Sequence, residues 1–254
     1  MSPLRLHSFH VKIATMRRRF FVSHFENQRA SIEGEPAHHL GRVLRAQPGQ
    51  LYELSDGTSV WLGRIDAVTK DRVDFSLVEQ LAVCTTKLKT TLLLSVVKFD
   101  AFEWALEKAT ELGVTRIVPL ASARSEKALL AAAAKRAERW RKILAESSQQ
   151  CRRVQLPILV ALTKPEDAFA SSMESLRVLL SESPEASPLR NALSGSSEST
   201  VALAIGPEGG WTDSEFSAAR TAHFHEAGLG KLILRTETAV VASLAAIHFA
   251  LSAD

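Results

Sequence analysis

Residues 91–120 combine a β-strand, a helix and a second strand, and this order restricts the fold more than any other feature of the chain. The segment 91–97 is largely apolar, as in a buried strand. Apolar residues then recur at helical spacing, namely Phe102, Ala105, Leu106, Ala109 and Leu112. Gly113 ends the helix, and a β-prone run follows over 114–120. Strands joined through a helix lie parallel, so the sequence predicts an α/β domain with a mostly parallel sheet.

The rest of this domain continues the alternation of strands and helices. Residues 126–149 predict a long helix because their alanine run favours helix, and further strands are expected at 157–162, 176–180 and 201–205. Asp100, with Glu103 three residues later, predicts a capping box at the start of the first helix. The segment 181–199 holds seven serines, two prolines and one glycine, which predicts a surface loop.

Residues 17–83 show a different pattern, in which short alternating runs are separated by turn residues. Asp56-Gly57 lies between two β-prone runs and predicts a hairpin, and Pro48-Gly49 marks another turn. Residues 72–78 alternate apolar and polar side chains, as in a half-buried strand. Several short strands with turns between them predict a small β-barrel ahead of the α/β domain.

Composition and length restrict the class of protein. The chain has 254 residues, of which 46% are hydrophobic and 23% are charged, which excludes a wholly disordered chain and a coiled-coil rod. Cys84 and Cys151 are too few for a disulfide framework or a multi-cysteine metal site, so a reducing cytoplasm is the expected compartment. No apolar run reaches the ~18 residues of a membrane span. Residues 1–15 lack the pattern of a secretory signal and are expected to be a disordered extension or the result of a start codon placed too early, with a transit peptide as the alternative.

Charge is distributed unevenly along the chain. Residues 1–160 carry a net charge of +9 and residues 161–254 a net charge of −6. A polyanion would therefore bind the first part of the chain, and an enzyme pocket could lie in the second. Basic side chains scattered over solvated faces are the alternative explanation.

A glycine-rich segment gives the strongest signal for a ligand site. The expected strand 201–205 ends in Gly206-Pro207-Glu208-Gly209-Gly210, and Thr212 with Glu215 predicts a capping box at the start of the next helix. Glycines let the backbone pass close to a ligand, and a strand–loop–helix junction is a usual ligand position in an α/β sheet. An ordinary tight turn is the alternative for this loop taken alone.

A second polar segment follows near the end of the chain. A short strand is expected over 232–234, followed by Arg235-Thr236-Glu237-Thr238 and an apolar helix. Thr236 is a natural helix N-cap, and Glu237 favours the helix dipole. Capping does not explain an arginine at the end of a buried strand, where a cation needs a partner. Because capping does not account for all of these polar groups, the segment is predicted to take part in a functional site.

Several familiar sites are missing from the sequence. There is no P-loop, G-x-S-x-G or HExxH, and no G-x-G-x-x-G follows a strand, which argues against a Rossmann nucleotide site. The pairs His38-His39 and His223/His225 lack further ligands at zinc spacing, so no metal is expected.

Five motifs in order together resemble one family. They are His38-His-Leu-Gly-Arg-Val-Leu-Arg, Glu107-Lys-Ala-Thr-Glu-Leu-Gly-Val, Arg139-Trp-Arg-Lys-Ile, Ile205-Gly-Pro-Glu-Gly-Gly and Leu234-Arg-Thr-Glu-Thr-Ala. They are similar to the bacterial 16S rRNA (uridine-N3) methyltransferases of the SPOUT superfamily of knotted methyltransferases. The likeness runs from Met16 or Arg17 to the end of the chain. The sequence departs from the usual family residues at Ala101, at Ala123 (usually glutamate), at Gln149 and at Arg152 (usually glycine).

The resemblance implies a fold and a cofactor. It implies a PUA-like RNA-binding β-barrel over 16–86 and a SPOUT α/β domain with a trefoil knot and a parallel sheet over 87–254. It also implies a homodimer, with part of the apolar helix 239–251 at its interface, and S-adenosylmethionine as methyl donor. The implied cofactor-binding residues are Leu180, Ser181, Gly206, Pro207, Gly209, Gly210, Leu229, Gly230, Leu232, Leu234 and Thr238.

The implied activity is methylation of N3 of a specific uridine in 16S rRNA of the 30S subunit. Arg235 would stabilise the developing uridinate or orient it, and Glu237 or Glu208 would orient Arg235 or accept the proton. The residues expected to bind RNA phosphates are Arg17, Arg18, Arg19, Arg42, Arg45, Lys98, Arg124 and Arg153. The alternatives are a knotted methyltransferase acting on another RNA and a non-catalytic RNA-binding ribosome-assembly factor.

Overall fold

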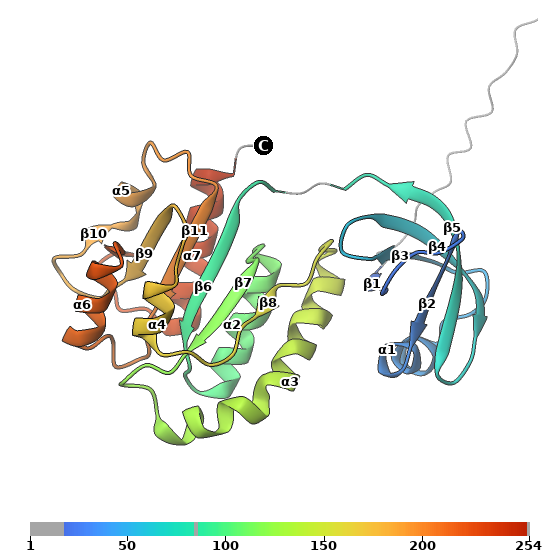
Figure 1. The fold of residues 1–254 in the computed structure, drawn as a ribbon, viewed down its shortest axis with the longest axis horizontal. Coiled ribbons are helices and arrows are strands. Elements are labelled where there is room, and N and C mark those ends of the chain that lie inside the picture. The colour runs from blue at the N-terminus through green and yellow to red at the C-terminus, as the bar shows by residue number, and fades with distance from the viewer. Residues whose placement is uncertain (1–17, 84–85, 253–254) are drawn as a thin grey trace, which may run out of the picture.

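The N-terminal unit is built around one curled sheet. The computed structural model describes residues 18–83 and 86–252, and Figure 1 shows the N-terminal unit beside a larger C-terminal one. The strands are β1 (Arg19–Phe21), β2 (Arg29–Glu33), β3 (Leu51–Ser55), β4 (Val60–Val68) and β5 (Arg72–Leu81), in the order β1-β3-β4-β5-β2. The helical turns α1 (Glu35–His38) and η1 (His39–Val43) cover one opening of the sheet, and Leu40 is fully buried beneath them. The expected hairpin is confirmed, because β3 and β4 pair antiparallel, and Asp56 Oδ1 in the turn accepts hydrogen bonds from the backbone N–H groups of Thr58 and Ser59.

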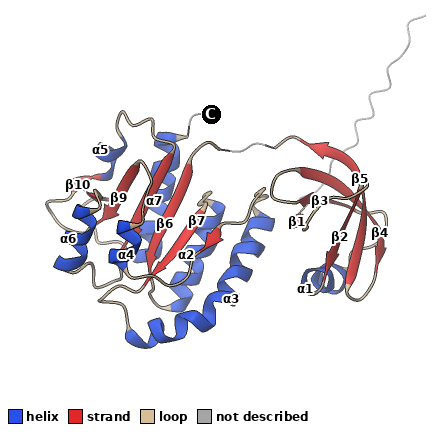
Figure 2. Ribbon diagram, in the orientation of Figure 1, coloured by secondary structure: helices blue, strands red, loops and turns tan. Residues whose placement is uncertain are grey.

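The C-terminal unit is an α/β fold with a wholly parallel sheet, as predicted. Its strands are β6 (Lys89–Ser95), β7 (Arg116–Leu120), β8 (Ile158–Leu159), β9 (Leu176–Leu180), β10 (Ser187–Pro188), β11 (Thr200–Ile205) and β12 (His225–Gly228), in the order β10-β12-β9-β11-β6-β7-β8. Its helices are α2 (Phe99–Glu111), α3 (Lys127–Gln150), α4 (Pro165–Ala170), α5 (Leu189–Leu193), α6 (Asp213–Thr221) and α7 (Thr236–Leu251). Figure 2 shows helices on both sides of this sheet.

Alternation along the strands supplies two apolar layers. On β6, Leu92 and Leu94 pack with α2, α3 and α7, whereas Leu93 packs on the opposite face with α4 and α6. A strand buried on both faces needs a continuous apolar run, which is the pattern that identified β6 in the sequence. Trp140 of α3 lies against Phe102 of α2 with ring centroids 4.7 Å apart, and this contact anchors the long helix.

Two local expectations were wrong. Helix α2 begins at Phe99, and Asp100 does not cap it, because the carboxylate of Glu103 is turned into the core side of the helix and accepts hydrogen bonds from Arg136 and Arg139. The segment 181–199 is not only loop, since β10 pairs with β12 and Leu189 and Leu193 of α5 are buried in the core. Buried tertiary partners decided both segments.

A buried ion-pair cluster joins the two units. Glu53 of β3 is 8% exposed and binds Arg19 at 2.9 Å from its own unit and Arg152 at 3.7 Å from the other. Arg19 also donates to the backbone carbonyl of Arg152, and Ser55 Oγ donates to the carbonyl of Val154 at 2.8 Å. Arg152 adopts a left-handed backbone with φ of 58°, a conformation that glycine adopts more readily. In this conformation the Arg152 side chain reaches from the C-terminal unit to Glu53.

Within residues 18–83 and 86–252, no helix is long and apolar enough to cross a membrane.

Candidate functional site

A cavity of about 1200 Å³ lies at the carboxyl edge of the parallel sheet. Strands β12, β9 and β11 are neighbours in the sheet, so the segments that follow them lie side by side. These segments are 181–183, 206–210 and 229–235, and all three line the cavity. The N-terminal turns of α2 and α7 complete its wall. Brought together by the strand order, three loops that are distant in sequence form one site.

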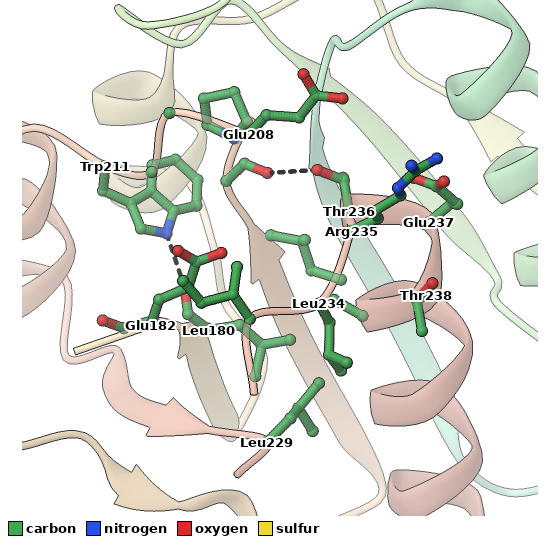
Figure 3. Close-up of a pocket in the computed structure, with 18 of the residues that line it drawn as sticks. Leu180, Glu182, Glu208, Trp211, Leu229, Leu234, Arg235, Thr236, Glu237 and Thr238 are labelled. Atoms are coloured by element: carbon green, nitrogen blue, oxygen red, sulfur yellow. Dashed lines mark hydrogen bonds between the residues drawn. The ribbon is translucent and has the colours of Figure 1, made fainter. Parts of the chain in front are cut away.

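Two hydrogen bonds tie the three segments together (Figure 3). Trp211 Nε1 donates to the carbonyl of Leu180 at 2.9 Å, which joins the loop after β11 to the end of β9. Thr236 Oγ1 donates to the carbonyl of Gly206 at 3.4 Å, which joins the same loop to α7. The Trp211 ring packs so closely on Gly206 that a Cβ there would lie 3.0 Å from it. Gly206 therefore meets a packing requirement in addition to any contact with a ligand.

Glu215 fixes the outer end of the glycine-rich loop. The predicted capping box at Thr212 and Glu215 is confirmed, and the Glu215 carboxylate accepts from the backbone N–H of Thr212 at 2.7 Å. Its second oxygen accepts from the backbone N–H of Ala123 at 2.9 Å. Next to Ala123, Arg124 Nη1 donates to the carbonyl of Gly209 at 2.8 Å. The loop after β7 thus supports the glycine-rich loop, and its Arg124 lines the cavity as well.

Every residue expected to bind the cofactor lines this one cavity. The set comprises Leu180, Ser181, Gly206, Pro207, Gly209, Gly210, Leu229, Gly230, Leu232, Leu234 and Thr238. Glu208, Arg235 and Glu237, which were expected to act in catalysis, line it as well. Figure 3 shows Arg235 and Glu237 next to one another at the start of α7, with Glu208 across the cavity. The structure therefore gathers the apolar, glycine and charged parts of the predicted site at a single place.

The segment before α7 differs from the sequence expectation. Residues 229–235 form a loop instead of a strand over 232–234, and Leu232 and Ile233 are 82% and 78% exposed. Arg235 is exposed at the N-cap of α7, so it is not a buried cation in need of a partner. Thr236 is not the N-cap either, since it is the first residue of α7 and its hydroxyl donates a hydrogen bond to the carbonyl of Gly206.

The residues expected to bind RNA fall into three groups. Lys98 and Arg124 line the cavity, whereas Arg18, Arg42 and Arg45 are exposed on the N-terminal unit. Arg17 and residues 1–15 lie outside the described residues. Arg19 and Arg153 form the third group, and both are engaged by partners inside the protein.

The expectation that Arg19 and Arg153 bind RNA phosphates was wrong, because the N–H groups of both side chains are engaged inside the protein. Arg19 is 9% exposed and binds Glu53 and the carbonyl of Arg152. Arg153 donates to the carbonyls of Thr110 at 2.9 Å and Gln155 at 3.1 Å, and burial lowers the pKa of its guanidinium below the ordinary arginine value. A guanidinium that satisfies backbone carbonyls at this depth is not placed to receive a phosphate.

Sequence reasoning missed two aromatic residues of the site. Trp211 is 4% exposed and joins two loops, and Trp104 of α2 lines the cavity while remaining 44% exposed. Trp211 directly follows the two glycines of the loop, and Trp104 interrupts the polar face of an amphipathic helix. The sequence context of both tryptophans is compatible with a place in a ligand site, but a tryptophan next to a turn is equally typical of ordinary core packing. Within residues 18–83 and 86–252, no three potential metal ligands cluster.

Comparison with known proteins agrees with this geometry. A family model described as an RNA methyltransferase domain matches residues 84–248, and one described as an RNA methyltransferase PUA domain matches residues 32–78. Ribosomal RNA small subunit methyltransferase E of Synechocystis sp. is 34% identical over 217 residues, covering 83% of this chain and 70% of that protein. The protein of the same name from Bacillus subtilis is 29% identical, covering 86% and 89% of the two chains.

Two solved structures extend the likeness to three dimensions. The Neisseria gonorrhoeae ribosomal RNA small subunit methyltransferase E bound to S-adenosyl methionine has a TM-score of 0.83 at 30% identity, covering 93% of this chain and 98% of that one. A Legionella pneumophila methyltransferase in complex with the same cofactor has a TM-score of 0.85 at 28% identity, covering 94% and 100%. Both agree with the present chain over both of its units.

Proposed function

The chain belongs to the ribosomal RNA small subunit methyltransferase E family, and we propose that it methylates N3 of a specific uridine in 16S rRNA of the 30S subunit. Membership makes it an S-adenosylmethionine-dependent methyltransferase of 16S rRNA. The observation that carries the finer proposal is that Arg235, Glu237 and Glu208 line the same cavity as the three loops. Residues 16–86 would bind RNA, and residues 87–254 would transfer the methyl group.

The residues of the cavity fit S-adenosylmethionine. Leu180, Leu229 and Leu234 supply apolar walls for an adenine ring, and the glycine-rich loop offers backbone groups without side chains in the way. The limited space at Gly206, where a Cβ would meet Trp211, keeps that backbone close to the end of β9. When bound, S-adenosylmethionine supplies an electrophilic methyl group on a sulfonium.

The charged side chains suit a substrate nitrogen that must lose a proton. The N3–H of uracil is a weak acid, and its deprotonated form is an anion spread over the ring. Arg235, exposed at the cavity, would hold that developing negative charge. Glu237 or Glu208 would orient Arg235 or accept the proton from N3. This division of roles needs no metal ion.

The target uridine has to leave its stack to reach the cavity. Phosphates on either side would meet Lys98 and Arg124 at the cavity and Arg18, Arg42 and Arg45 on the N-terminal unit. The buried cluster at Glu53 holds the two units in one relative position. RNA bound to the N-terminal unit would therefore present its uridine at a fixed distance from the cavity.

A homodimer and a knotted chain are parts of the same proposal. Leu232, Ile233 and Phe249 are 82%, 78% and 93% exposed, which is unusual for such large apolar side chains and suits burial against a second copy. Light scattering should give twice the mass of one chain.

We further propose that the chain is threaded into a trefoil knot at the segment 229–235. We also propose that the enzyme works in the cytoplasm, where 30S subunits are assembled.

The experiment that tests the reaction uses unmodified substrate. Purified protein and labelled S-adenosylmethionine are incubated with 30S subunits, free 16S rRNA or transfer RNA from a strain lacking this gene, and the nucleoside is identified after digestion. We expect N3-methyluridine at one site of 16S rRNA. Label in transfer RNA would instead indicate another RNA target. Failure to bind the donor would indicate an RNA-binding assembly factor.

Trp211→Phe tests the join between the two donor loops. Phenylalanine keeps the ring packed on Gly206 but removes the hydrogen bond to the carbonyl of Leu180. A lost neutral hydrogen bond costs about 1 kcal/mol, so we expect the Kd for S-adenosylmethionine to rise about fivefold by calorimetry. Trp104→Phe is the matched control, because the Trp104 indole also lines the cavity but makes no hydrogen bond to a loop within the described residues, and it should change that Kd by less than twofold. Equal effects of the two variants would refute the role given to Trp211.

A further inference from the structure

An arginine pair on α3 shares one buried carboxylate of α2. Glu103 is 8% exposed, and its two oxygens accept from Arg136 Nη1 at 3.3 Å and from Arg139 Nε at 2.7 Å. The two arginines are one turn apart on α3, so both guanidinium groups reach the same acceptor. The negative charge of a buried carboxylate has to be neutralised by a positive charge, but a single arginine is enough for that.

The second positive charge leaves this cluster cationic and open to solvent. The side chains of Arg136 and Arg139 are 42% and 61% exposed, although both are held by Glu103. Each uses one nitrogen on the carboxylate, and a guanidinium has five N–H donors, so donors remain free on the exposed side. The Arg136 guanidinium also lies 4.6 Å from the centre of the Phe99 ring, which fixes its plane. Asp100 and Glu146 act on Arg139 only at longer range.

The cluster lies between the cavity and the N-terminal unit. Phe99 is flanked by Lys98 and Asp100, which both line the cavity, and Glu103 precedes Trp104, which lines it too. At the other side, Lys142 of α3 forms an ion pair with Glu35 of the N-terminal unit. Figure 1 shows α3 running from the lower end of the parallel sheet toward that unit. An RNA strand that reaches both units would pass the exposed arginines.

We propose that Arg136 and Arg139, held in place by Glu103, bind a backbone phosphate of the RNA next to the nucleotide that enters the cavity. This inference rests on the proposed function. Arginine suits the role because its planar fork matches a phosphate, and two guanidinium groups fixed on one carboxylate are already oriented before RNA arrives. Neither arginine lines the donor cavity, so the contact would act on RNA affinity and leave donor affinity unchanged.

The test measures binding of unmodified 16S rRNA by filter retention over a range of salt concentrations. Arg139→Gln should weaken RNA binding about fivefold and lower the salt slope by about one, as expected for one lost phosphate contact. Its Kd for S-adenosylmethionine should stay within twofold. Arg141→Gln removes the same charge from an exposed position of the same helix and is the matched control, with less than a twofold effect on RNA binding.

A double variant separates a phosphate contact from simple charge compensation. Glu103→Gln combined with Arg139→Gln has the same net charge as the unaltered cluster and leaves no buried charge unpaired. If Arg139 only neutralises Glu103, the double variant regains full RNA affinity, and the inference fails. If Arg139 touches phosphate, the double variant binds RNA as weakly as Arg139→Gln. Because binding is measured without turnover, loss of methylation in the unaltered protein would refute the proposed function and not this contact.

Discussion

Arg235→Ala is expected to lower kcat for methylation of 30S subunits by about 10²–10³-fold, the usual cost of removing a group that stabilises developing charge. The cause is the position of the guanidinium, which is exposed at the first turn of α7 and lines the cavity. The loop proposed to bind the donor is held by the hydrogen bonds of Thr236 and Trp211, and these do not involve Arg235. The Kd for S-adenosylmethionine should therefore change by less than about threefold, which calorimetry can measure beside the kcat.

Conservative variants distinguish the roles of Arg235, Glu237 and Glu208 in the proposed reaction. Arg235→Lys keeps the charge and should recover part of the lost rate, whereas Arg235→Gln should behave as the alanine variant does. Glu237→Gln and Glu208→Gln identify the proton acceptor, since only the residue that takes the N3 proton gives a large loss that rising pH partly restores. Unchanged turnover in Arg235→Ala would exclude a role in the reaction and leave it as an ordinary surface residue.

Sequence reasoning succeeded where the determinant is local. The capping box at Thr212 and Glu215 and the hairpin at Asp56 are made by residues within three positions of each other, and both formed as expected. Strands β6, β7, β9 and β11 were recognisable because burial on both faces demands continuous apolar runs, whereas β10 and β12 were not predicted. The three loops at the cavity were placed by the resemblance to the methyltransferase family, because the local pattern alone does not give the strand order that brings them together.

The failures share a different cause, which is a partner distant in sequence. Arg19 and Arg153 look like any other basic residue in the sequence, and only the fold shows that Glu53 and the carbonyl of Thr110 engage them. The run at 232–234 has a strand's composition, but the structure leaves Leu232 and Ile233 exposed. The sequence shows that these residues are apolar, but it does not show whether another loop, a ligand or a second copy of the chain covers them.

Glu215→Ala should have the largest effect on stability. The carboxylate is 1% exposed and receives the backbone N–H groups of Thr212 and Ala123 together with the Thr212 hydroxyl. Removing it leaves these donors without an acceptor, and an unpaired buried donor costs about 1–3 kcal/mol. We expect the free energy of unfolding to fall by about 3 kcal/mol, as measured by denaturant titration of the complete chain.

The same change should also weaken the site, because Glu215 links the loop that carries Arg124 to the loop that carries Gly209. We expect the Kd for S-adenosylmethionine to rise tenfold or more under conditions in which the variant is still folded. Asp213→Ala is the matched control, since Asp213 occupies the same first turn of α6 but is exposed and should contribute only about 0.5 kcal/mol through the helix dipole. If Glu215→Ala proved no more damaging than Asp213→Ala, the two loops would be held by their own packing, and the carboxylate would be only a helix cap.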